Sequence, residues 1–61
     1  MNIFVIEAWN NNGECVWQET CETLAKAKKE ARDCLAQKDM QDVATVVILN
    51  GNFREIARIN K

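Results

Sequence analysis

Apolar and polar residues alternate with a period of two in the first and last thirds of this chain, and they follow a helical spacing between. The alternation over residues 2–9, 14–19, 43–49 and 52–60 predicts four β-strands, because successive strand side chains point to opposite faces of a sheet. Residues 23–38 contain four alanines and no glycine, proline or β-branched residue after position 23, which predicts a helix. The expected element order is ββαββ.

Two asparagine–glycine pairs predict the turns of two β-hairpins. Asn12-Gly13 lies between the first two strands and Asn50-Gly51 between the last two, and this dipeptide favours a two-residue turn. The cross-strand pairs that follow are Ala8 with Trp17, Ile6 with Glu19, Ile48 with Phe53 and Ala44 with Ala57. A three-residue loop would exchange the two faces of the sheet. The two hairpins show no evident similarity in sequence.

One side of the predicted helix is apolar and is expected to pack on the sheet. Five residues share this side at 3.6 residues per turn: Leu24, Ala27, Ala31, Cys34 and Leu35. The two alanines allow the helix to approach the sheet closely and leave room for large rings. The rings expected there are Phe4, Trp17 and Phe53. Thr23, or Thr20 one turn earlier, suits the N-cap. Lys38 suits the last helical turn, and Met40 is expected to close one end of the core.

The expected fold is α+β, with a four-stranded antiparallel sheet and one helix on one face, and residues 1–61 form a single small ββαββ domain. The runs 2–9 and 43–49 are apolar on both faces, which is typical of central strands. The last strand carries charges that protect an exposed edge. These features favour the strand order 2-1-3-4, with one right-handed crossover. The order 2-1-4-3 is the alternative.

The outer face of the sheet, on the side away from the helix, is expected to be apolar. Eight residues are assigned to it: Ile3, Val5, Trp9, Val16, Val43, Val47, Leu49 and Ile56. One helix can cover only one side of the sheet, and burying each such side chain is worth roughly 1.5–3 kcal/mol. Contiguous apolar patches mark interaction sites. We therefore expect an interface, most simply a two-fold homodimer. A different register or core is the alternative.

Composition also favours association. A chain of 61 residues has a core that rarely supplies more than about 3–5 kcal/mol. Three cysteines, no histidine and no C-x-x-C pair argue against disulfides or zinc as the stabilising element. The formal net charge of −1 attracts neither a membrane nor nucleic acid, and no membrane span or signal peptide is evident. We expect a cytoplasmic protein with no metal and no cofactor.

Candidate reactive groups are few. Cys15 and Cys34 are assigned to the core as small apolar residues. Cys21 precedes the helix, whose N-terminal dipole can lower a thiol pKa, so it is the best candidate for a reactive thiol. Glu19 and Glu55 are expected to face inward at the sheet margins with a raised pKa. No histidine base, paired acid or phosphate-binding loop accompanies them, so we expect no catalytic residues and no enzyme activity.

These patterns favour a small protein–protein interaction module that binds a second copy or another protein through the outer face. Its size and lack of reactive groups suit an accessory protein of a phage or mobile element that inhibits a host factor sterically. The alternative is weak nucleic-acid binding by a basic side of the helix. Four residues would contact phosphates there: Lys26, Lys28, Lys29 and Arg32. Acidic residues are interleaved with them, which is typical of a solvated helix surface.

Overall fold

The computed structural model describes residues 3–61, which form four strands and one helix in the expected ββαββ order. The elements are β1 (Phe4–Asn10), β2 (Cys15–Cys21), α1 (Leu24–Ala36), the short 3-10 helix η1 (Lys38–Met40), β3 (Val43–Leu49) and β4 (Glu55–Asn60). Asn2, which was expected in the first strand, lies outside the described residues.

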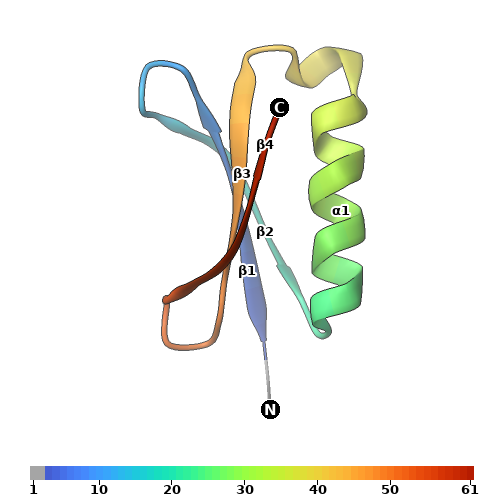
Figure 1. The fold of residues 1–61 in the computed structure, drawn as a ribbon, viewed down its shortest axis with the longest axis vertical. Helices are drawn as coiled ribbons and strands as arrows, with labels where there is room; N and C mark the ends of the chain where they lie inside the picture. The colour runs from blue at the N-terminus through green and yellow to red at the C-terminus, as the bar shows by residue number, and fades with distance from the viewer. Residues whose placement is uncertain (1–2) are drawn as a thin grey trace.

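The strands form one antiparallel sheet in the order β2-β1-β3-β4, so the expected order is confirmed and the alternative 2-1-4-3 is wrong. The two strands that are apolar on both faces, β1 and β3, lie in the middle of the sheet. Figure 1 shows α1 along one side of the sheet, and both hairpin loops bend to the other side. The face away from α1, the outer face, therefore has a loop standing at each end.

The core lies between α1 and the inner face of the sheet. Its buried members are Ile6, Ala8, Cys21, Ala27, Ala31, Cys34, Val43, Val46 and Ile48. Ala27 and Ala31 are fully buried, and the half-buried rings of Phe4 and Trp17 pack against the same cluster. Small helix residues thus leave room for large strand residues, as expected. Met40 also packs against this cluster from η1.

Side-chain capping sets the start of α1. The Thr23 hydroxyl accepts a hydrogen bond from the Lys26 N–H at 3.2 Å, which satisfies one of the free N–H groups of the first turn. The helix ends at Ala36 because Gln37 has extended backbone angles. Lys38 was expected in the last helical turn, and this expectation is wrong: it begins η1 instead.

The two hairpins share one loop structure, although their sequences look different. The side-chain oxygen of Asn10 accepts hydrogen bonds from the N–H groups of Asn12 (3.0 Å) and Glu14 (2.9 Å). Asn50, forty residues later, accepts them from Asn52 (2.9 Å) and Arg54 (3.0 Å). In each loop the N–H three residues after this asparagine also donates to its carbonyl oxygen. An asparagine anchors both loops through its own side chain.

Each loop has three residues between the paired positions and is followed by a β-bulge. Register shifts occur between Ala8 and Trp9 in the first hairpin and between Ile48 and Leu49 in the second, again forty residues apart. A three-residue loop would exchange the faces, but the extra residue of the bulge exchanges them back. The expected pairs Ala8–Trp17 and Ile6–Glu19 are therefore confirmed.

The second hairpin differs from its expected register by an even number of residues. Ile48 opposes Ala57 rather than Phe53, so the expected pairs Ile48–Phe53 and Ala44–Ala57 are wrong. An even shift keeps each side chain on its face, and Ile59 packs against the core as expected. Phe53, however, falls in the loop and is 70% exposed, so its assignment to the core is wrong.

Irregularities in strand pairing also place two further residues differently from the sequence prediction. Cys15 was expected in the core but is exposed, because it lies beside the bulge of β2. Val43 was assigned to the outer face, and that assignment is wrong. The pairing of β1 with β3 shifts between Trp9 and Asn10, so Val43 turns toward α1 and is only 1% exposed in the core.

Phe53 has a backbone conformation that suits glycine. Its φ is 61°, and the equivalent residue of the first loop is Gly13, with a φ of 80°. In this left-handed region the Cβ of an ordinary residue crowds the following carbonyl, at a cost of roughly 1–2 kcal/mol. The same loop is therefore built once with the residue that fits it and once with a large aromatic residue.

We expect Phe53→Gly and Phe53→Asn to stabilise the folded chain. Relief of the left-handed strain should exceed the entropy cost of glycine, about 0.5–1 kcal/mol, and leave a net gain of about 0.5–1 kcal/mol. Chemical denaturation measures this change, at concentrations low enough for the midpoint to be independent of concentration.

Gly13→Ala is the matched control, because an added Cβ there meets nothing within 4 Å. Its cost of about 1 kcal/mol would come from the backbone only. A Phe53→Gly chain less stable than the parent would show that the ring stabilises the monomer.

Candidate protein-binding surface

The outer face of the sheet carries most of the residues that the sequence assigned to it. Those from the strands are Val5, Trp9, Val16, Val47, Leu49 and Ile56, and the alternation of β1 continues back to Ile3. None of these seven belongs to the core cluster under α1. They form one continuous set over adjacent strands, and Val43 is the assigned residue that lies elsewhere.

The centre of the outer face is already covered within one chain. Val5 is 8% exposed and Val47 is 6% exposed, although no helix lies over them. The cross-strand neighbours of Val47 are Glu7 on one side and Arg58 on the other. Long side chains at such positions cover an apolar neighbour with their methylene groups. The sequence therefore overestimated the number of apolar side chains on this face that need a partner to bury them.

Exposed apolar surface is concentrated around this centre. Ile3 is 40% exposed, Val16 48% and Ile56 42%, while Trp9 and Leu49 are half-buried. Val16 and Ile56 are the extra residues of the two bulges. A bulge bends its strand and redirects side chains. The side chains of Val16 and Ile56 are therefore exposed at corresponding positions on the two edge strands, β2 and β4.

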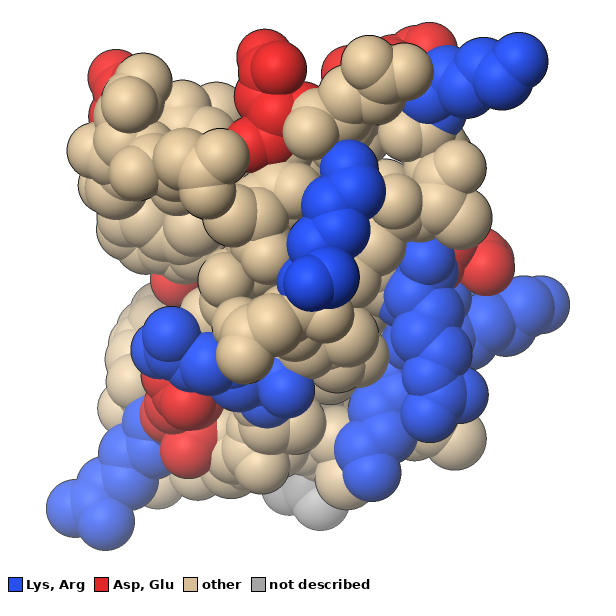
Figure 2. All heavy atoms as spheres, turned by 45° about the horizontal axis from the view of Figure 1, so that its top comes forward, with Lys and Arg blue, Asp and Glu red and all other residues tan. Residues whose placement is uncertain are grey.

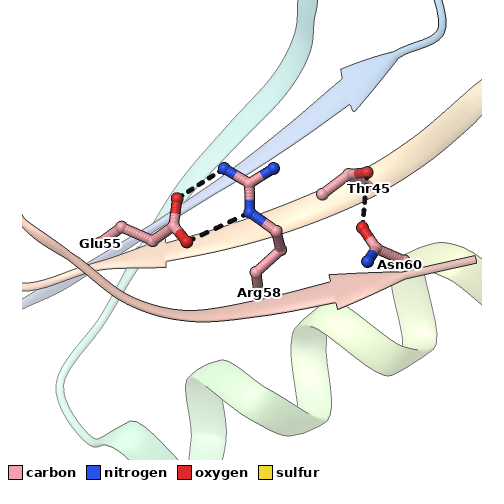
Figure 3. A network of polar contacts seen from close by, with 4 residues as sticks. All are labelled: Thr45, Glu55, Arg58 and Asn60. Carbon is pink, nitrogen blue, oxygen red and sulfur yellow. Dashed lines mark hydrogen bonds and ion pairs between the residues drawn. The ribbon is translucent and has the colours of Figure 1, made fainter.

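Polar groups on the outer face are paired with one another. Gln18 donates to the Glu7 carboxylate at 3.1 Å, and the Thr45 hydroxyl donates to the Asn60 side-chain oxygen at 2.9 Å. Figure 3 shows this second pair beside Arg58, whose guanidinium forms two hydrogen bonds with one carboxylate. Internal pairing leaves fewer polar groups that need water, which lowers the cost of covering this face.

The ion pair of Arg58 with Glu55 depends on the bulge of β4. Its closest N···O distance is 2.7 Å, and the second hydrogen bond measures 3.1 Å. Residues three apart on a regular strand point to opposite faces, so the bulge is what brings these two together. Glu55 was expected to face inward with a raised pKa, and this is wrong: its hydrogen bonds with Arg58 lower its pKa.

An open hollow of about 340 Å³ lies at the end of the outer face nearest the first hairpin loop. Its lining residues come from β1, the first loop, β3 and β4: Trp9, Asn10, Gly13, Thr45, Val47 and Arg58. An aromatic, an aliphatic and a basic residue thus border one space. We call this space the outer hollow.

The basic residues of the alternative hypothesis lie on the exposed side of α1. Lys26, Lys28, Lys29 and Arg32 are all exposed. Figure 2 shows a strip of basic side chains on the side of the molecule where α1 lies, with acidic side chains next to it. This surface is separate from the outer face, because α1 packs on the opposite side of the sheet.

Two of the three cysteines, Cys15 and Cys21, differ from expectation in exposure or in pKa. Cys21 is the last residue of β2 and is buried, and burial together with the negative charge of Glu19 raises its pKa. The expected activation by the helix dipole is wrong, because desolvation of the thiolate is the larger effect. Cys34 lies in the core as expected, and burial raises its pKa too. Cys15 is the exposed thiol.

Other classes of site are not found in the part of the chain that the structure describes. Among residues 3–61, no three cysteine, aspartate or glutamate side chains are grouped so that they could hold a metal ion. No helix in this range is long and apolar enough to cross a membrane, since α1 has 13 residues.

Reasoning from the sequence did not place Phe53 in a loop, and it did not predict the ion pair of Arg58 with Glu55 or the hydrogen bond of Thr45 with Asn60. The signal that could have found Phe53 is the repeated Asn-x-Asn at positions 10–12 and 50–52. Aligning these two asparagine pairs places Phe53 opposite Gly13, in a loop instead of a strand. No comparable signal exists for the ion pair, because it requires a bulge whose position follows from the folded register.

We expect one of the three thiols to react rapidly in the native chain. A raised pKa leaves little thiolate on Cys21 and Cys34 at about pH 8, whereas Cys15 is exposed. Titration with a chromogenic disulfide should therefore give one fast equivalent, and three after unfolding. Cys15→Ser is the control and should remove the fast phase.

These two buried thiols also predict the direction of an alkaline effect. Because folding favours their neutral form, their contribution to stability is present below the unfolded pKa of about 9 and is lost as pH rises through the higher folded pKa. Fast reaction of Cys21 in the Cys15→Ser chain would contradict this account.

No family model, curated protein or solved structure matches this chain. Its surface chemistry is therefore the basis for any functional conclusion.

Proposed function

We propose that this chain is a small protein-interaction module that binds a second copy of itself through the outer face of its sheet. The observation that carries the proposal is the set of exposed apolar residues, Ile3, Val16 and Ile56, around the outer face, which no helix covers. Exposed apolar side chains that gather on one face are typical of protein interaction sites.

The size of the outer face and its hairpin loops support this role. A standard interface covers about 800 Å² on each partner, roughly a fifth of the 4309 Å² that this chain exposes. The sheet is seen edge-on in Figure 1, so its face spans the 32 Å and 15 Å directions of the Cα trace. The hairpin loops stand at both ends of this face and enlarge the surface that a partner can cover.

The charges of the outer face also favour association. Arg58 and Glu55 neutralise one another, which leaves Glu7 as the unbalanced charge among the strand residues of this face, with a hydrogen bond from Gln18 to its carboxylate. Like-charge repulsion between two such faces is therefore small, and the exposed apolar rim supplies the attraction. A two-fold axis buries both faces at once and closes the assembly as a dimer.

A reducing cytoplasm is the compartment that this proposal assumes, since the three cysteines are unpaired. Inhibition of a host factor by a phage-borne chain stays a prediction from the sequence. A host factor that bound this chain would compete with the second copy for the outer face.

We expect the native protein to sediment as a dimer of twice 7.0 kDa, and Val16→Glu and Ile56→Glu to sediment as monomers. Both positions are about half exposed in one chain, so a charge there should leave the monomer folded, as circular dichroism can check. Val5 and Val47 are poorer probes, because a charge at a buried position would unfold the chain.

Lys29→Glu, on the exposed side of α1, is the control and should leave the dimer unchanged. Sedimentation of the native protein as a monomer at every concentration would contradict the proposal.

Salt separates the proposed dimer from the nucleic-acid alternative. An apolar interface should change little between about 50 and 200 mM salt, whereas phosphate binding by Lys26, Lys28, Lys29 and Arg32 should weaken steeply. Fluorescence anisotropy of a labelled single-stranded oligonucleotide at both salt concentrations measures the second effect. Binding at low salt that Lys28→Glu abolishes would favour the alternative.

A further inference from the structure

Phe53 combines two unusual properties in one residue. It is 70% exposed, the most exposed large apolar side chain of residues 3–61, and its φ of 61° suits glycine. The first loop has the same hydrogen bonds and carries glycine at the corresponding position. Backbone strain of this kind clusters at functional sites. Neither packing nor the turn explains the phenylalanine.

The loop that carries Phe53 bends to the side where the outer face lies. In Figure 1 the loop between β3 and β4 bends away from α1, at the opposite end of the sheet from the loop between β1 and β2. The outer hollow lies at the end of the first loop, since Asn10 and Gly13 line it. The loop that carries Phe53 and the outer hollow are therefore at opposite ends of the sheet, on the side away from α1.

The lining of the outer hollow suits an aromatic ring. Trp9 offers an indole for an edge or offset contact. The guanidinium of Arg58 forms two hydrogen bonds to Glu55, and a guanidinium bonded in its plane can stack on an aromatic ring through its flat side. A cavity of about 150 Å³ accepts a benzene ring, and the hollow is about 340 Å³. The space is large enough for a phenyl side chain.

We propose that Phe53 is the anchor of the dimer and inserts into the outer hollow of the second copy. This inference rests on the proposed function. A two-fold axis lying between the two faces and perpendicular to the strands places the second loop of each copy over the first-loop end of the other. Each dimer then contains two identical contacts of Phe53 with Trp9 and Arg58. The loops thereby take part in the interface.

Sedimentation equilibrium on the native chain, Phe53→Gly and Phe53→Leu tests the anchor. Phe53→Gly should weaken dimerisation at least about hundredfold, because two anchor contacts are lost per dimer. The same substitution should raise the stability of the monomer. Opposite changes in association and in monomer stability would support the anchor, since a purely structural residue changes both in one direction. Phe53→Leu keeps the strain and an apolar group, so it should weaken the dimer less.

A double-mutant cycle locates the contact. Arg58→Met keeps the methylene stem over Val47 but removes the guanidinium, and its effect on the dimer should be smaller in the Phe53→Gly background than in the native one. Additive effects would overturn the assignment of Phe53 to this hollow.

The failures of the two proposals are distinguishable. A native dimer whose dissociation constant does not change in Phe53→Gly would overturn the anchor and leave the dimer proposal standing. A native protein that stays monomeric would overturn both.

Discussion

The structure depends on how an asparagine side chain closes each hairpin. Asn10 and Asn50 each accept two backbone hydrogen bonds across their own loop, and this fixes a loop of three residues. A three-residue loop would by itself turn the core side chains outward. The bulge that follows each loop reverses this exchange, so Ala8 and Ile48 remain in the core. Loop and bulge therefore work as one unit, used twice at a spacing of forty residues.

The same unit determines the character of the outer face. Each bulge leaves one apolar residue exposed, Val16 or Ile56, near the root of its loop. The bulge of β4 also places Glu55 beside Arg58, whose side chain lies next to Val47. A regular hairpin would have separated that ion pair. The local geometry that protects the core thus also creates an exposed apolar rim and an almost neutral centre.

Phe53 is the point where local preference and global structure disagree. A sequence that specifies its fold well places glycine or asparagine at a left-handed position, as Gly13 shows in the first loop. A large aromatic residue there is expected to reduce monomer stability, and it exposes apolar surface. In a small domain with little stability to lose, this cost is understandable if the ring stabilises an assembly. Because Phe53 lies outside the core, its effect on monomer stability can be separated from its effect on assembly.

The sequence by itself determined the element order, and it favoured the observed strand order, the Thr23 cap and the packing of Ala27 and Ala31 against Phe4 and Trp17. These follow from periodicity and size, which are properties of short segments. Only the tertiary structure decided the positions of Phe53, Val43 and Cys15. Each depends on a one-residue irregularity in strand pairing, and alternation in a sequence cannot show where a neighbouring strand skips a residue. Cover over Val5 and Val47 was likewise undecided by the sequence, because it comes from side chains on adjacent strands.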